Sequence, residues 1–203
     1  MIKSIRITLL ILSMLYFSNV CAQSNDYIVK SGNDTVYIDK IKLKYDKIKV
    51  KYKNENITYS FDKINCFYLS KSEELHVKVK SPNAHMENAR KEIFMIRLTN
   101  NGKVNLLKYS ESGTGFSGGI ETYKLCFINI LNSKPELIDI PSDNGIFKES
   151  LSYEAFIQLK DYLYGNTEIL KTLDNLRTKK HKKLTDKIIA VINDYNAWES
   201  TKS

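Results

Sequence analysis

The segment Gly115-Phe116-Ser117-Gly118-Gly119 fits the pattern Gly-x-Ser-x-Gly, which surrounds the nucleophilic serine of many hydrolases. In those enzymes the serine lies on a sharp turn between a strand and a helix, which exposes its hydroxyl. Here residues 120–131 follow, and they are rich in strand formers. We therefore interpret the segment as a hairpin loop. Ser117 is a nucleophile only in the alternative hypothesis, a hydrolase acting on cell-envelope material.

The sequence patterns of other catalytic and ligand-binding sites are weak or absent in this sequence. The same loop lacks the lysine and the following helix that a phosphate-binding loop needs. His76, His85 and His181 are scattered, and no close spacing of cysteine, histidine and carboxylate typical of a metal site occurs. We expect no catalytic residue, no metal, no cofactor and no enzymatic activity.

Lysines alternate with apolar residues in two neighbouring segments, 41–45 and 48–52. This alternation predicts a hairpin with one apolar side and one lysine side. A two-residue turn at Asp46-Lys47 accounts for the change of phase between the segments, although it lacks the glycine that such turns favour. A single long strand with a bulge is the alternative. The predicted partners are Tyr45 with Ile48, Leu43 with Val50, and Ile41 with Tyr52.

Lys42, Lys44, Lys49 and Lys51 would share the other side of that hairpin. Such a side can bind an acidic polysaccharide, a lipopolysaccharide phosphate or a negative protein surface. A solvated outer face that discourages association between strand edges is the other interpretation. The sequence favours the second, because no arginine is present in this stretch to make bidentate phosphate contacts.

The net charge of +8 on 203 residues is concentrated in two segments. Residues 39–53 hold seven lysines against Asp39 and Asp46, and residues 177–183 hold five basic residues. The rest of the chain is therefore slightly acidic, and the protein is not uniformly basic. The second segment is typical of a solvated linker between helices.

The first residues have the three parts of a secretory signal. Lys3 and Arg6 precede an apolar run over residues 7–17, and Val20-Cys21-Ala22 comes before Gln23. This pattern predicts a signal peptide over residues 1–22, cleaved after Ala22. The alternative, an uncleaved anchor, is disfavoured because the apolar run is about half of the roughly 20 residues that a spanning helix needs.

Export follows from that prediction. We expect a periplasmic, outer-membrane-associated or secreted protein with no transmembrane segment after cleavage, and we do not expect nucleic acid as a partner. Lipidation of Cys21 is disfavoured because Ser18-Asn19-Val20 lacks the small residue that lipoprotein signals carry before the cysteine. An exported compartment permits a disulfide between Cys66 and Cys126. Two free thiols on separate strands are the alternative.

Between residues 26 and 140 the sequence predicts about ten short strands joined by turns, among them the hairpin signal Asn100-Asn101-Gly102. After Pro141 the apolar period becomes helical, over residues 151–163, 167–176 and 184–195. We expect an α+β fold in which an antiparallel β meander, a sandwich or a partly open barrel, is followed by about three C-terminal helices packed on it. The predicted domains are an antiparallel β domain over 23–141 and a helical segment over 142–203.

Three pieces of the β region resemble a known group. Tyr27-Ile28-Val29, Asn33-Asp34-Thr35-Val36, and Asp62-Lys63-Ile64 with Phe67-Tyr68 are similar to segments of small uncharacterised exported proteins of Bacteroidota. The resemblance extends to the C-terminal helices, whereas Asn33 and Ile38 replace glycines that are common in that group. It implies compartment and architecture, and it carries no catalytic motif. Asp34-Thr35-Val36 also resembles the site at which these bacteria attach O-glycans, which makes Thr35 a candidate for glycosylation.

The sequence therefore predicts a non-catalytic exported protein that serves as a binding module. Its expected partner is an envelope protein or an anionic glycan. The hydrolase alternative requires a pocket in which Ser117 converges with a base.

Overall fold

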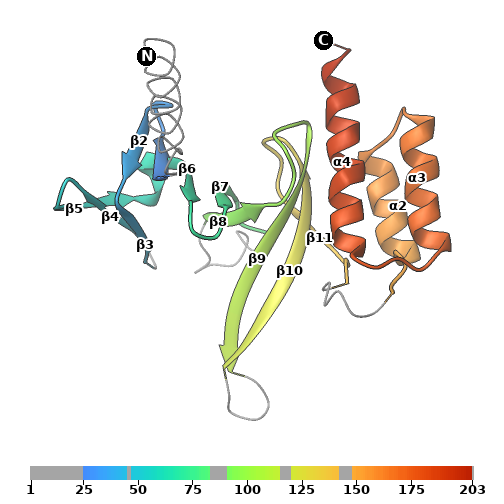
Figure 1. Ribbon diagram of the computed structural model, residues 1–203, viewed down its shortest axis with the longest axis horizontal. Helices are drawn as coiled ribbons and strands as arrows, with labels where there is room; N and C mark the ends of the chain where they lie inside the picture. The colour runs from blue at the N-terminus through green and yellow to red at the C-terminus, as the bar shows by residue number, and fades with distance from the viewer. Residues whose placement is uncertain (1–24, 45–46, 83–90, 115–119, 142–147, 203) are drawn as a thin grey trace, which may run out of the picture.

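An eight-stranded antiparallel sheet and a smaller three-stranded sheet make up the β region, and three helices follow them (Figure 1). The computed structural model describes residues 25–44, 47–82, 91–114, 120–141 and 148–202. The large sheet has the order β11-β10-β9-β8-β7-β6-β1-β2, and the small sheet has the order β3-β4-β5. The predicted α+β class and the meander are confirmed. The strands are β1 (Asp26–Lys30), β2 (Thr35–Ile38), β3 (Lys40–Leu43), β4 (Lys47–Tyr52), β5 (Glu55–Ser60), β6 (Ile64–Leu69), β7 (Glu74–Lys80), β8 (Glu92–Arg97), β9 (Val104–Thr114), β10 (Ile120–Ile130) and β11 (Glu136–Ile138).

The helices are α2 (Tyr153–Tyr162), α3 (Thr167–Thr178) and α4 (Leu184–Ser200). The first begins after Ser152, whose hydroxyl accepts a hydrogen bond from the Ala155 backbone N–H at 3.2 Å. The cap of α3 is Asn166, one residue before the predicted Thr167. Its side-chain oxygen accepts two of the backbone N–H groups that the first turn of a helix leaves unpaired. Within the described residues, none of these helices is long and apolar enough to cross a membrane.

The lysine-rich segments form the predicted hairpin, but with a different register. Leu43 lies opposite Ile48 and Ile41 opposite Val50, so each partner is two residues away from the predicted one. The two-residue turn at Asp46-Lys47 is therefore wrong. The Lys44 N–H donates to the Lys47 carbonyl at 2.9 Å, so the two residues between the paired positions are 45 and 46, one position earlier than predicted. Tyr45 and Asp46 lie outside the described residues.

Both covers of the large sheet lie on the same one of its faces. A row of directly paired positions crosses all eight strands, and side chains in such a row point to the same side. At one end Val36, Ile28 and Phe67 in this row belong to the core beneath the small sheet. At the other end Cys126 and Ile138 belong to the core beneath the helices. The row is Val36, Ile28, Phe67, His76, Ile96, Lys108, Cys126 and Ile138.

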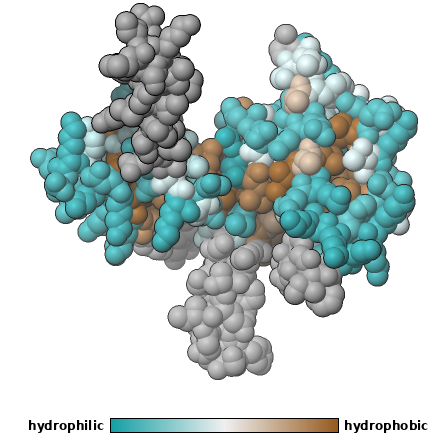
Figure 2. All heavy atoms as spheres, in the orientation of Figure 1, coloured by the Kyte–Doolittle hydropathy of each residue, from teal (hydrophilic) through white to brown (hydrophobic). Residues whose placement is uncertain are grey.

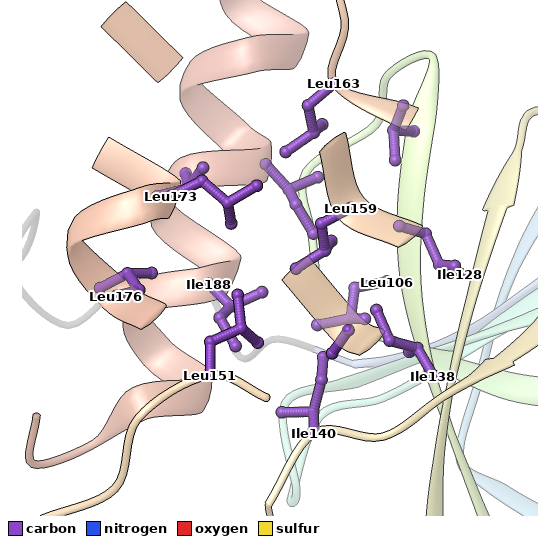
Figure 3. Packing of buried hydrophobic residues seen from close by; sticks show 14 of the residues in the cluster. Leu106, Ile128, Ile138, Ile140, Leu151, Leu159, Leu163, Leu173, Leu176 and Ile188 are labelled. Atoms are coloured by element: carbon purple, nitrogen blue, oxygen red, sulfur yellow. The ribbon is translucent and has the colours of Figure 1, made fainter. Parts of the chain in front are cut away.

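The helix-covered end contains the largest hydrophobic core. Leu106, Ile128 and Ile138 point from the sheet toward leucines and isoleucines of the helices (Figure 3). Leu159 and Leu173 are among the helix residues that are fully buried there. This packing confirms that the C-terminal helices lie on the β region.

An amide clamp fastens α4 to the start of β9. The Asn196 side chain accepts a hydrogen bond from the Val104 backbone N–H at 3.0 Å and donates one to the Val104 carbonyl at 2.8 Å. It thus takes the place of a neighbouring strand at this position. Gly102 lies directly against Asn196, and a Cβ at that position would overlap the Asn196 side chain. A glycine is needed here for close approach rather than for backbone conformation.

The opposite face of the large sheet carries an apolar cluster of its own. Met95, Leu107 and Phe127 are buried there, and every described member of this cluster comes from β7, β8, β9 or β10. The strands β7 and β8 run across the long β9–β10 hairpin (Figure 1). The sheet is therefore bent at this place, so that β7 and β8 lie over β9 and β10.

The cysteines do not form the predicted disulfide. Cys66 lies on β6 and Cys126 on β10, and both are free thiols. Three strands separate β6 from β10, which places the two residues about 19 Å apart at the usual spacing of about 4.8 Å per strand. Their side chains also point to opposite faces, because Phe67, next to Cys66, shares the face of Cys126. A disulfide needs Cα atoms within about 7 Å.

Candidate functional site

Thr35, one of the residues singled out in the sequence, is not brought into a site with other described residues. Ser117 lies outside the described residues, as does the predicted signal peptide over 1–22. Thr35 is exposed at the start of β2, an edge strand of the large sheet. Its hydroxyl is accessible there, and its glycosylation stays a prediction.

The predicted lysines do gather on one surface. Lys40, Lys42, Lys44, Lys49 and Lys51, which we call the lysine face, are all exposed. Lys42 lies directly opposite Lys49, and Lys40 lies directly opposite Lys51. Opposing residues of an antiparallel pair are about 5 Å apart and alternate residues of a strand about 6.8 Å apart. The four paired lysines therefore form a compact grid of positive charge.

The third strand adds neutral polar side chains to the same surface. On β5, Thr58 lies opposite Lys49 and Asn56 lies opposite Lys51. In the part of the chain that the structure describes, no ion pair joins a carboxylate to Lys40, Lys42, Lys49 or Lys51. Figure 2 shows that this end of the molecule is covered mostly by hydrophilic residues. Among the described residues, no carboxylate thus neutralises the charge of these four paired lysines.

The other side of the small sheet holds the lysine face in place. Ile48 and Val50 are buried, and Ile41 and Tyr52 pack against the same core. These four residues confirm the predicted apolar side, whereas Leu43 is 47% exposed near the free end of β3. Because the lysines alternate with these anchored residues, the backbone positions of the grid are fixed even though the lysine side chains are free to move.

The second basic segment is organised differently. Arg177 forms an ion pair with Asp174, with a shortest distance of 2.7 Å, and its guanidinium lies over the Phe156 ring. The neighbouring lysines sit in the connection between α3 and α4 rather than on a sheet. This arrangement fits the predicted solvated linker.

A titratable cluster lies on the large sheet between its two covers. The His76 ring stacks on Phe67 with ring centroids 4.4 Å apart, and its Nε2 lies 3.6 Å from Glu74, too far for a hydrogen bond. Burial lowers the pKa of His76, against the opposing effect of the Glu74 carboxylate. Glu74 also lies 3.7 Å from the Lys108 ammonium group. The cluster has one carboxylate, and its cation and stacked ring are the usual partners of a buried histidine.

Glu74 and His76 are two residues apart on β7, but Phe67 and Lys108 reach them from β6 and β9 only in the folded sheet. The sequence pattern therefore gave no indication of this cluster. Among the described residues there is no group of three or more histidine, cysteine or acidic side chains able to hold a metal ion. The chain matches no model of a known protein family, no curated protein and no solved structure.

Proposed function

We propose that this protein is an exported, non-catalytic binding module whose lysine face binds an anionic glycan. The observation that carries the proposal is the register of the small sheet, which places Lys42 opposite Lys49 and Lys40 opposite Lys51. Like charges directly opposite each other destabilise a strand pair. A bound polyanion would place negative charge next to both ammonium groups and so offset the repulsion between them.

Protection of strand edges can account for the lysines of β3, an edge strand, but not for Lys49 and Lys51. Lysine discourages association when it lies on an edge strand. Lys49 and Lys51 lie on β4, which is the central strand and is paired on both sides. A solvated face would need polar residues at these positions, but it would not need two like-charged pairs.

A glycan fits this surface better than a protein partner. Cores of protein interfaces are enriched in aromatic residues, methionine and arginine, which supply most of the binding energy. The described strand positions of the lysine face and its β5 neighbours are lysine, threonine and asparagine. Lysine acts as a compact point charge on a flexible stem, which suits single negative charges repeated along a polymer.

Retention on heparin and on dextran sulfate tests the proposal. We expect the variant with Lys42, Lys44, Lys49 and Lys51 all changed to Glu to bind about tenfold or more weakly, equivalent to about 1.4 kcal/mol. Binding of the natural protein should weaken as salt is added, because these charges are exposed and screened. The variant should still fold, since the like-charged pair of Lys42 and Lys49 is replaced by another like-charged pair.

A matched control separates the lysine face from net charge. Changing Lys179, Lys180, Lys182 and Lys187 to Glu alters the charge by the same amount on exposed helix and linker positions. We expect this control to lose much less retention. Equal losses in the two variants would contradict a specific face and would leave only non-specific attraction to a basic protein.

A further inference from the structure

Two buried amide oxygens lack hydrogen-bond partners on the face of the large sheet that neither cover occupies. Asn105 on β9 and Asn129 on β10 are directly paired, and each is only 4% exposed. Among the described residues, the Oδ1 atoms of both have no hydrogen-bond partner. Buried polar atoms are nearly always paired, because an unpaired one keeps the cost of losing water without recovering a bond. Two of them side by side therefore indicate a missing donor.

A pocket of about 380 Å³ lies at these two asparagines. Val77 and Val79 of β7 and Leu107 of β9 give it apolar walls, and Arg97 of β8 contributes a cationic group. Arg97 is itself held in place, because its Nη1 donates to Asn101 Oδ1 at 3.0 Å. The volume lies within the usual range for small-molecule sites, roughly 300–1,000 Å³, and mixed apolar walls with a few convergent polar groups are typical of such sites.

The chemistry of the pocket restricts its ligand. The unpaired oxygens need hydrogen-bond donors, and an ionised carboxylate or phosphate is an acceptor only. The charged lining is positive on balance, with Arg97, Lys78 and Lys80 against the single carboxylate of Glu92, and therefore disfavours a cationic ligand. What remains is a neutral molecule that donates hydrogen bonds, accepts them from Arg97, and presents an apolar side to the valines and Leu107.

The spacing of the two acceptors favours a sugar over a peptide. Side chains paired across two strands are about 5 Å apart at their Cβ atoms. Backbone N–H groups on one side of an extended peptide are farther apart, about 6.8 Å. Neighbouring hydroxyls of a sugar ring are closer together and can each donate to one amide oxygen, while the C–H groups of the ring contact the apolar walls.

We propose that this pocket binds a neutral sugar residue. The amides of Asn105 and Asn129, whose oxygens are closed to solvent without a ligand, turn toward it and accept hydrogen bonds from adjacent hydroxyls. The site is distinct from the lysine face. It lies on β7–β10, on the face of the large sheet away from the small sheet, and its ligand is uncharged.

The test is a titration of isotope-labelled full-length protein with D-glucose, D-galactose, D-mannose and N-acetyl-D-glucosamine, with trialanine as a peptide probe. We expect at least one sugar to shift the side-chain NH₂ resonances of Asn105 and Asn129 in a saturable way. Asn105→Leu should weaken binding of that sugar at least tenfold. The melting temperature of this variant without sugar should be no lower than that of the natural protein. If Asn105→Leu does not fold, Asn105→Thr takes its place and should also weaken binding of the sugar.

Several outcomes would overturn this proposal. If no sugar shifts either side chain, the two oxygens hold water only. If trialanine alone shifts them, the ligand is a peptide, and if Asn105→Leu binds sugar unchanged, the pocket is not the site. The variant with Lys42, Lys44, Lys49 and Lys51 changed to Glu should keep its sugar binding, so failure of the lysine face and failure of this pocket are distinguishable.

Discussion

The two ends of the large sheet are covered on the same face but by different means. At one end three helices bury a broad core with Leu106, Ile128 and Ile138 (Figure 3). An amide clamp from Asn196 also fixes α4 to Val104 there. At the other end the three-stranded sheet covers a smaller core and turns the lysine face outward. Both ends bury their apolar side chains, but among the described strand pairs only the small sheet places lysine directly opposite lysine.

This difference separates the parts of the chain that stabilise the fold from the part that is free to bind. Some charged side chains at the helical end are held in ion pairs, as in the contacts of Glu199 with Lys103 and Lys202 at 3.3 and 3.1 Å. The exposed lysines between α3 and α4 lie on a connection rather than opposite one another on paired strands. The paired lysines of the small sheet have no such partners among the described residues, and their register is unfavourable to the folded state. A surface that costs stability and is nevertheless held on a rigid support is a candidate for function.

The largest effect is expected at the helical end. Asn196→Leu leaves the Val104 N–H and carbonyl buried without partners, which should lower the free energy of unfolding by about 2–4 kcal/mol. Urea unfolding measures this loss. Asn193→Ala is the control, because Asn193 accepts only one exposed hydrogen bond, from the Asn100 N–H at 2.8 Å, and should cost about 0.5–1.5 kcal/mol. Similar losses in both variants would show that the clamp does not anchor the helical end.

An intermediate effect is expected between the two covers. The pKa of His76 in the folded protein lies below its ordinary value of 6.5, so the unfolded chain binds a proton more readily. The contribution of this group to stability is therefore complete above about pH 6.5 and is lost as the pH falls below that value, by at most about 1.4 kcal/mol per pH unit.

Melting temperatures of the natural protein and of His76→Gln, compared between pH 7.5 and pH 5.5, measure this contribution. The natural protein should lose more stability than the variant, because glutamine does not titrate. Parallel losses in the two proteins would show that other groups, such as Glu74, dominate the acid response of this region.

The smallest effect is expected on the lysine face, where replacing a natural residue should increase the free energy of unfolding rather than lower it. Lys49→Gln removes the repulsion with Lys42 and should raise the free energy of unfolding by about 0.2–1 kcal/mol at low salt. The gain should shrink at high salt. Lys80→Gln is the matched control, since Lys80 lies opposite Glu92 and its loss should lower stability. A loss of stability in both variants would show that the pairing of Lys49 with Lys42 does not destabilise the small sheet.

Local pattern was enough to predict much of the small sheet but not its register. The alternation in segments 41–45 and 48–52 identified the apolar side correctly for Ile41, Ile48, Val50 and Tyr52. A shift of two residues keeps every side chain on the same side, so alternation alone cannot distinguish the predicted pairing from the observed one. The loop that Lys44 and Lys47 close decided it.

The sugar pocket was beyond prediction for a related reason. In the sequence Asn105 and Asn129 each stand between two apolar residues of a strand. A polar residue in that position is typically on the side of a sheet that faces solvent. The bend that places β7 and β8 over β9 and β10 buries that side instead. The possible disulfide between Cys66 and Cys126 is not formed, for a similar reason. The residues next to each cysteine do not predict how many strands separate the two or to which face each side chain points.

By itself the sequence determined the α+β class, the order of strands and helices, and which side of the lysine hairpin is apolar, because these depend on periodicity within a few residues. Only the tertiary structure decided that the small sheet and the helices share one face, that lysine lies opposite lysine, and that two asparagines meet at a pocket. Those features depend on register and on the bend of the sheet, which are set by packing between segments far apart in the chain.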